Sequence, residues 1–287
     1  MEIVSCKGML KAKSRKNSQI VSIVVEMDSG ICHLTVIPMR AEPSHCSEMV
    51  SQLLFGETYR IRETTEEWVQ IETHHDNYSG WIQRKQCFKV SDEAFDRYLK
   101  ADKLRLSVPF AMTGARIPNV LSMGALTVTE PELSPFRERF TIPKAENWWP
   151  ADGVPDISRI QRMDLLRKTA FSLLGTPYLW GGRTPLGIDC SGFVQLLYSL
   201  VGVQLPRDAS QQVLCGEPLD FVHEARLGDL AFFHNEEGRI VHVGMMLGDG
   251  TIIHSSGSVR IDRIDETGIF NEEVQRYTHQ LRVIVRV

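Results

Sequence analysis

The stretch TPYLWGGRTPLGIDCSGFVQLLYSLVG, residues 176–202, decides the fold that we expect for this chain. Its first half is rich in Gly and Pro, and its second half places apolar residues three and four positions apart over residues 193–201. That spacing predicts a buried helix, and Cys190 stands at or just before its first turn. Because the start of a helix favours an anion, we expect a thiol that loses its proton readily and acts as a nucleophile. A buried structural cysteine is the alternative.

Two short apolar runs downstream each carry a histidine. RIVHVGMML, residues 239–247, contains His242, and TIIHS, residues 251–255, contains His254. The Gly-Asp-Gly sequence between them predicts a hairpin turn, so the runs are expected to be adjacent antiparallel strands. A cysteine nucleophile needs a base, and the base needs a partner that orients it. We expect His242 to be the general base and His254 to accept a hydrogen bond from its far ring nitrogen. Two core histidines are the alternative.

These motifs together resemble the NlpC-type family of cell-wall cysteine peptidases. The resemblance rests on DCSGF, on HVGM and on the strand that ends in His254, with flanking matches in YLWGG, LPRDASQQ and GDLAFF. It covers about residues 157–287. It implies a papain-like fold with Cys190, His242 and His254 as the catalytic triad.

The resemblance also implies roles for residues close to the nucleophile. Tyr178 matches the tyrosine of the family's YxWGG motif, whose hydroxyl lies near the oxyanion, and the Cys190 N–H can supply a second contact. Packing beside Trp180 is the alternative for Tyr178. Asp189 and Ser191 resemble substrate-contacting positions. A carboxylate at Asp189 would raise the pKa of the thiol, so we expect it to bind ligand or to cap the helix.

Further substrate contacts are implied by the LPRD motif. Asp208 matches a family residue that contacts the ammonium group of substrates with a free N-terminus, and Arg207 and Trp180 are assigned to the same substrate-binding set. Some relatives have a serine directly after this aspartate. Here Ala209 and then Ser210 follow, which leaves the neighbouring contact open.

The N-terminal half consists of short strand-like pieces separated by turn residues, which predicts a small barrel or sandwich. The pieces GETYRIRET, WVQIE and GWIQ resemble a bacterial SH3-like domain, and PSHCSEMVSQLLFGE resembles the subgroup in which such domains wall off the cleft. In that subgroup a glutamate and a tyrosine of the first SH3-like domain complete the ammonium pocket, which implies Glu48 and Tyr78. A generic β-domain, with Glu48 in a solvated loop, is the alternative.

The expected fold class is α+β. A papain-like cysteine peptidase domain, with helices packed on an antiparallel sheet, follows two small all-β SH3-like barrels. We expect residues 1–93 to hold a lead and the first SH3-like domain, residues 94–152 a second, divergent one, and residues 153–287 the peptidase domain.

Two helices and one linker are expected at the joins between these domains. Helices are predicted near residues 91–103 and over residues 157–174. A turn-rich linker at residues 146–155 contains Trp148 and Trp149, which we expect to pack the second domain onto the third.

Composition excludes several function classes. The 287 residues have a net charge of −4 and no basic patch, so we expect no nucleic-acid partner. No apolar run approaches the roughly 20 residues that a membrane span needs, and no signal peptide is recognised. We therefore expect a cytoplasmic protein, with the periplasm as the alternative, and a monomer. The six cysteines form no disulfide framework, and without a CxxC or HExxH motif we expect no metal and no cofactor.

The resemblance implies a murein-derived peptide as substrate. The expected reaction is hydrolysis of the bond between γ-D-Glu and the diamino acid, diaminopimelate or lysine, in peptides with a free N-terminal L-Ala. It releases L-Ala-γ-D-Glu in the recycling or turnover of cell-wall peptides. An endopeptidase or amidase that acts on intact peptidoglycan is the second possibility, and a non-catalytic wall-binding protein is the third.

Overall fold

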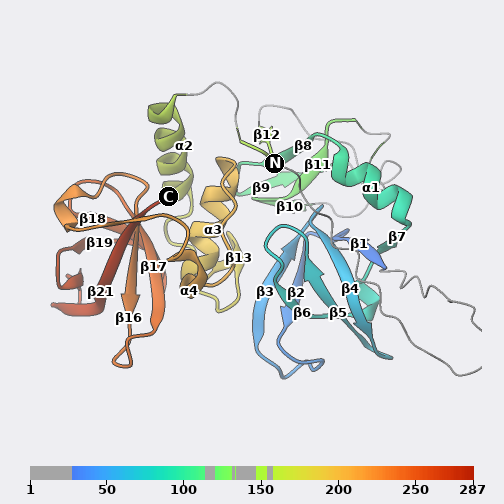
Figure 1. The fold of residues 1–287 in the computed structure, drawn as a ribbon, viewed down its shortest axis with the longest axis horizontal. Helices are drawn as coiled ribbons and strands as arrows, with labels where there is room; N and C mark the ends of the chain where they lie inside the picture. The colour runs from blue at the N-terminus through green and yellow to red at the C-terminus, as the bar shows by residue number, and fades with distance from the viewer. Residues whose placement is uncertain (1–27, 114–119, 131–132, 134–146, 154–157) are drawn as a thin grey trace, which may run out of the picture.

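The computed structural model describes residues 28–113, 120–130, 133, 147–153 and 158–287 (Figure 1). The expected N-terminal lead and the two ends of the expected linker lie outside these residues. Within them, the chain forms two β-rich halves, and helices α3 and α4 lie between them (Figure 1). No helix in this described part has the length and apolar content that crossing a membrane requires.

The first β unit is an antiparallel sheet of seven strands in the order β3-β2-β6-β5-β4-β1-β7. Alternate residues of these strands point inward, as the period of a half-buried strand requires. Ile37, Met39, Ile61 and Ile71 thus belong to a core of this unit alone. The strands are β1 Ser29–Ile31, β2 Val36–Arg40, β3 Met49–Leu54, β4 Thr58–Thr64, β5 Trp68–Thr73, β6 Ser79–Gln83 and β7 Lys89–Val90, with a 3-10 helix at Arg84–Gln86.

The second β unit begins with the predicted helix, α1 (Asp92–Lys100), which Ser91 caps by accepting a hydrogen bond from the Ala94 N–H. Strand β8 then pairs with β11 and β12, while β9 and β10 form a separate hairpin. Its core also contains Ile31 and Phe55 of the first unit, so the two units share one apolar cluster. The boundary at residue 93 stays a prediction. The strands are β8 Lys103–Leu106, β9 Phe110–Met112, β10 Val120–Ser122, β11 Leu126–Val128 and β12 Trp148–Pro150.

The paired tryptophans divide between two cores. Trp148 is buried in the cluster of the second β unit. Trp149, on the other face of β12, packs against the core of the C-terminal part of the chain. The expectation that this pair joins the two parts is confirmed, because successive strand residues point to opposite faces.

The C-terminal part starts with α2 (Arg159–Ser172), where Ser158 and Gln161 form a reciprocal capping box. The helix is confirmed, although the apolar spacing that predicted it only partly faces the core: Leu166 and Ala170 are buried, while Ile160 is 81% exposed. After the short hairpin of β13 (Arg183–Thr184) and β14 (Gly187–Ile188), α3 (Cys190–Leu200) is buried along its whole length.

The C-terminal strands close into a ring. The sheet order is β15-β21-β16-β17-β18-β19-β20, and β21 also pairs with β20. Helix α3 packs on the outer face against Val243 and Met245, while Phe233, Met246 and Ile252 belong to a separate inner cluster. The remaining elements are α4 Ala209–Gln212, a 3-10 helix at Val222–Glu224, β15 Glu217–Leu219, β16 Leu230–His234, β17 Ile240–Met246, β18 Thr251–Ser256, β19 Ser258–Ile264, β20 Gly268–Asn271 and β21 Arg276–Arg286.

Candidate active site

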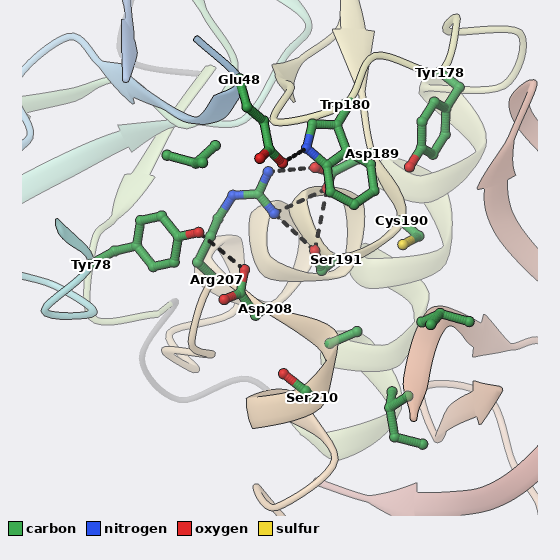
Figure 2. Close-up of a pocket in the computed structure, with 14 residues that line it drawn as sticks. Glu48, Tyr78, Tyr178, Trp180, Asp189, Cys190, Ser191, Arg207, Asp208 and Ser210 are labelled. Atoms are coloured by element: carbon green, nitrogen blue, oxygen red, sulfur yellow. Dashed lines mark hydrogen bonds and ion pairs between the residues drawn. The ribbon is translucent and has the colours of Figure 1, made fainter. Parts of the chain in front are cut away.

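The predicted nucleophile is the first residue of α3. Asp189 is the N-cap, and its carboxylate accepts a hydrogen bond of 2.7 Å from the Gly192 N–H. Cys190 follows and is 7% exposed. Its thiol borders a cavity of about 490 Å³ that lies between the first β unit and α3 (Figure 2). The predicted position of this cysteine is therefore confirmed.

The electrostatics of the thiol differ from the sequence-based expectation. Burial, followed by the charge of Asp189, raises the pKa of Cys190 to about 11. The backbone N–H groups of Val243 and Ser191 and the charge of Arg207 act in the opposite direction but do not compensate. The expectation that the helix start alone yields a readily ionised thiol is wrong for the unliganded protein, because removal from water outweighs the partial charge of a helix terminus.

The two histidines lie on neighbouring strands, as predicted. β17 and β18 are antiparallel, with Gly244 opposite His254. His242 Nε2 and His254 Nδ1 are 2.8 Å apart, so one donates a hydrogen bond to the other. Both side chains are on the inner face of the ring, since they alternate with the outward-facing Val243 and Ile253. Burial, then the charges of His254 and His279, hold the pKa of His242 well below its ordinary value of 6.5.

Cys190 reaches this pair at the point where β17 and β18 separate. The ladder between the strands starts at Gly244, and the thiol lies against the backbone N–H of Val243, next to His242. Among the hydrogen bonds of the described residues there is none between Cys190 and His242. Since burial suppresses the charge of each, thiol and imidazole are both neutral at pH 7 in the free protein.

Three residues that the sequence analysis did not single out surround the histidines. Asp262 accepts a hydrogen bond from His254 Nε2 at 3.0 Å, and Arg260 binds the same carboxylate. The ring of His279, on β21, stacks on that of His242 with centroids 4.2 Å apart. No distinct sequence signal marks Asp262, because charged and apolar residues alternate over residues 258–264. In the described part of the chain, no cluster of His, Cys, Asp and Glu side chains could hold a metal ion.

Tyr178 lies beside the nucleophile (Figure 2). Its backbone forms an isolated bridge with Ile188, which fixes it next to the start of α3. Burial, then the charges of Cys190 and Asp189, raise the pKa of Tyr178, so its hydroxyl keeps its proton and can donate it. The Cys190 N–H, at the first helical position, also has no partner within the helix. The oxyanion role of these two donors stays a prediction.

Asp189, Ser191 and Arg207 form one buried group in the lining of the cavity. The Asp189 carboxylate pairs with Arg207, and it also accepts hydrogen bonds from the Ser191 hydroxyl and the Gly181 N–H. Arg207 donates at 2.8 Å to the Ser191 hydroxyl and is 2% exposed. The expectation that Asp189 caps the helix is confirmed. A direct substrate contact by any of the three stays a prediction, because their side chains bind one another.

Residues of the first β unit close one end of the cavity. The Tyr78 hydroxyl donates to Asp208 Oδ1 at 3.3 Å, and Trp180 Nε1 donates to Glu48 Oε1 (Figure 2). Burial, then the charge of Asp208, raises the pKa of Tyr78 to about 12. Burial also raises the pKa of Asp208. The structure therefore brings all four side chains to one end of the cavity that contains Cys190.

A buried ion pair holds this wall in place. Arg183, in the WGGR segment, donates at 2.9 Å to each oxygen of Glu57 in the first β unit. It also donates at 2.7 Å to the Gln52 carbonyl oxygen. Gly181 approaches the same unit so closely that a Cβ there would lie 2.3 Å from the Met49 carbonyl oxygen. The sequence predicted none of these contacts, because the motifs around Glu57 and Arg183 do not specify which surfaces of two domains meet.

Comparisons with known proteins identify relatives over most of the chain. The model of the NlpC/P60 family matches residues 175–279, and that of the bacterial dipeptidyl-peptidase Sh3 domain matches residues 39–86. The chain is 30% identical over 251 residues to a protein of Bacillus subtilis named gamma-D-glutamyl-L-lysine dipeptidyl-peptidase, covering 80% of this chain and 81% of that one. It is 29% identical over 257 residues to dipeptidyl-peptidase 6 of Lysinibacillus sphaericus, covering 79% and 88%.

A solved structure has a similar fold over most of the chain. An NlpC/P60 family protein from Bacillus cereus superposes with a TM-score of 0.75 and covers 90% of this chain and 99% of that one. At 19% identity this likeness concerns the fold alone. It confirms the expected class, a papain-like domain preceded by SH3-like β structure.

Proposed function

Since this chain belongs to the NlpC/P60 family of cysteine peptidases, we propose that it hydrolyses the bond between γ-D-Glu and the diamino acid of murein peptides with a free N-terminal L-Ala. The product is L-Ala-γ-D-Glu, released during recycling or turnover of cell-wall peptides. Relatives that share about four fifths of the chain support this reading, because two are named for dipeptidyl-peptidase activity and one of these for the γ-D-glutamyl-L-lysine bond. Both lysine and diaminopimelate remain candidates for the third residue of the substrate.

The observation that carries the proposal is the acidic end of the cavity. Glu48 belongs to the first β unit and Asp208 to the peptidase domain, and both line the same cavity as Cys190. Burial raises the pKa of Asp208, which means that the residues around it do not fully stabilise its ionised form. A substrate ammonium group would supply the missing charge. A blocked N-terminus would instead leave the half-buried Asp208 carboxylate desolvated without a counter-charge, which is costly.

The proposed chemistry starts from the neutral pair. The Cys190 S–H proton moves to His242, sulfur attacks the carbonyl carbon of γ-D-Glu, and the C=O electron pair moves to the oxygen. The Cys190 N–H and the Tyr178 hydroxyl donate to this oxyanion. The C–N bond then breaks, the imidazolium gives its proton to the leaving amine, and a thioester remains. Water, deprotonated by His242, attacks the thioester, the C–S bond breaks to release L-Ala-γ-D-Glu, and the imidazolium returns its proton to sulfur.

The test compares L-Ala-γ-D-Glu-L-Lys with its N-acetylated form, and does the same for the diaminopimelate peptides. We expect kcat/KM for the free amine to be higher by on the order of 10²-fold or more, because the acetylated peptide leaves the acidic groups unpaired. The variant Asp208→Asn should lose activity on the free peptide and narrow this difference. Asp220 is exposed, and Asp220→Asn serves as a matched control that should change neither the activity on the free peptide nor the difference between the free and the acetylated peptide.

Other outcomes assign the protein differently. Equal rates on free and acetylated peptides would contradict the closed pocket and favour an enzyme that works on intact peptidoglycan. Hydrolysis that continues at the native rate in Cys190→Ala would exclude the cysteine mechanism. Binding to sacculi without turnover of any peptide would indicate a wall-binding protein.

A further inference from the structure

Inside the ring, His242, His254 and Asp262 form a row of hydrogen-bonded side chains that ends at the Asp262 carboxylate. Asp262 is 7% exposed, and His254, whose Nε2 it binds at 3.0 Å, is 1% exposed. Arg260 donates to both carboxylate oxygens, from Nε at 2.7 Å and from Nη2 at 3.0 Å. His254 lies opposite Arg260 in the strand register, so all three side chains are on the same face of the sheet. The carboxylate is therefore fixed from two sides.

The proton positions follow from which atoms can donate. An ionised carboxylate only accepts, so His254 Nε2 carries the proton that bonds to Asp262. The Nδ1 of a neutral His254 then has no proton and can only accept. His242 Nε2, 2.8 Å away, must donate to it. The other ring nitrogen of His242, Nδ1, is left without a proton and can receive one.

We propose that Asp262 is a positioning residue, which acts through His254 to hold His242 in the neutral tautomer that can serve as a base. The inference rests on the base role of His242 in the proposed function, but not on which peptide bond is cut. Arg260 is its second anchor, since it keeps the carboxylate from rotating away from His254. Around this row, His279 stacks on His242 from β21, and Glu273 binds the far side of Arg260 at 3.0 Å.

The charge state that the proposal needs is maintained at neutral pH. Burial alone would raise the pKa of Asp262, but the hydrogen bonds from His254 and Arg260 outweigh it and leave the pKa below its ordinary value of 3.8. Asp262 is thus ionised at neutral pH. It does not border the substrate cavity, so its effect should be on turnover rather than on binding.

The first test is a ¹⁵N NMR spectrum of the histidine side chains in the substrate-free wild-type protein, assigned with His242→Ala and His254→Gln. We expect a protonated Nε2 and an unprotonated Nδ1 in both rings. A protonated Nδ1 on His242 would overturn the proposal. The spectrum needs no substrate, so it decides the proposal even if neither murein peptide is cut.

The second test uses two variants of similar size. Asp262→Asn keeps an oxygen that can accept from His254, whereas Asp262→Leu fills the space without an acceptor. We expect Asp262→Leu to lose at least about tenfold in kcat with KM unchanged, and to show mixed tautomers of His242. Asp262→Asn should keep most of the wild-type kcat and most of the wild-type tautomer of His242. Equal loss in the two variants, with wild-type tautomers, would indicate a merely structural role. Asp220→Asn is again the control.

Discussion

The buried thiol of Cys190 sets the protonation state in which the free enzyme waits for substrate. Burial and the charge of Asp189 raise its pKa to about 11, while burial and two neighbouring histidines hold the pKa of His242 well below 6.5. A neutral pair, and not a thiolate and imidazolium, is therefore the resting state. Proton transfer then belongs to the attack on substrate, where the forming oxyanion and its donors stabilise the new charge.

This state predicts how the thiol reacts without substrate. We expect alkylation of Cys190 by iodoacetamide to rise about tenfold per pH unit from pH 7 to pH 10, since the thiolate is the reactive form. Peptide mass spectrometry separates this site from Cys46, Cys87 and the other cysteines, and Cys190→Ala identifies their background. A rate that is already constant at pH 7 would show that the thiol is ionised in the free protein.

At the residue scale, the sequence identified side chains that stand in contiguous motifs. Cys190 and His242 were found because a helix start and a strand can be predicted locally. Asp262 and Arg260 were not, because their role depends on the register of β18 against β19, which no local pattern specifies. The pKa of the thiol was misjudged for the same reason, since burial is a property of the folded chain.

The start of α3 depends on a close approach between backbones. A Cβ at Gly192 would lie 2.3 Å from the Gly182 carbonyl oxygen. Gly→Ala inside a helix ordinarily stabilises it by up to about 1 kcal/mol. Here the added methyl group must push α3 away from the loop that carries Tyr178, and with it the nucleophile.

We therefore expect Gly192→Ala to reverse the usual sign. It should lower the free energy of unfolding by about 1–3 kcal/mol, as overpacking does, and reduce kcat through displacement of Cys190. Urea denaturation and the tripeptide assay measure the two effects. Gly238→Ala is the comparison. Its φ of +76° adds backbone strain, but no atom lies within 4 Å of the new Cβ, so any loss of stability there comes from strain and not from a close contact. An unchanged or higher stability of Gly192→Ala would refute the close contact.

At the element scale, helices and hairpins were predictable and closure of the sheet was not. Helices form at both predicted places, with Ser91 and Ser158 as their N-caps, and the Gly-Asp-Gly turn correctly paired β17 with β18. The pairing of β21 with β20 and β16 was not predictable, because it depends on closure of the whole ring and not on a local pattern. Only the closed ring explains why an alternating strand such as β19 carries a buried aspartate.

The ion pair of Glu57 and Arg183 joins the first β unit to the peptidase domain, and both side chains are at most 4% exposed. Removing one partner leaves a buried charge unpaired, so we expect Glu57→Gln to lower the free energy of unfolding by about 3–5 kcal/mol. Replacing both, in Glu57→Gln with Arg183→Met, should recover part of this loss. Thermal unfolding of the single and the double variant measures both effects, and a Glu57→Gln protein as stable as wild type would contradict the role of the pair.

The same pair predicts a dependence on acid. Burial alone would raise the pKa of Glu57, but the charges of Arg183 and His75 outweigh it and hold the pKa below its ordinary value of 4.5. A lowered folded pKa contributes stability above the ordinary value, and this is lost as pH falls through the folded pKa. Wild type should therefore lose stability more steeply than Glu57→Gln below about pH 4.5, as judged by urea midpoints. Parallel curves would show that Glu57 is not the group responsible.

For the whole molecule, the sequence was informative about the order of the parts and less so about how they join. The family motifs in residues 176–255 predicted the peptidase domain, and turn-rich strands predicted β units ahead of it. That the second unit shares its core with Ile31 and Phe55 of the first was not predictable, since apolar periodicity does not say which surfaces meet. Assembly of Glu48, Tyr78 and Asp208 around one cavity likewise required the docked arrangement.

The position of β21 in the chain has a consequence for the timing of synthesis. This strand pairs with β15, β16 and β20, and it leaves the ribosome after every other strand of the ring. A nascent chain therefore already contains Cys190, His242 and His254 while the histidines still face water through the gap that β21 will fill. Strand β21 excludes water from His242, which keeps its imidazole neutral, and it also supplies the stacked ring of His279. Peptidase activity should accordingly appear with the final step of folding, and not earlier on the ribosome.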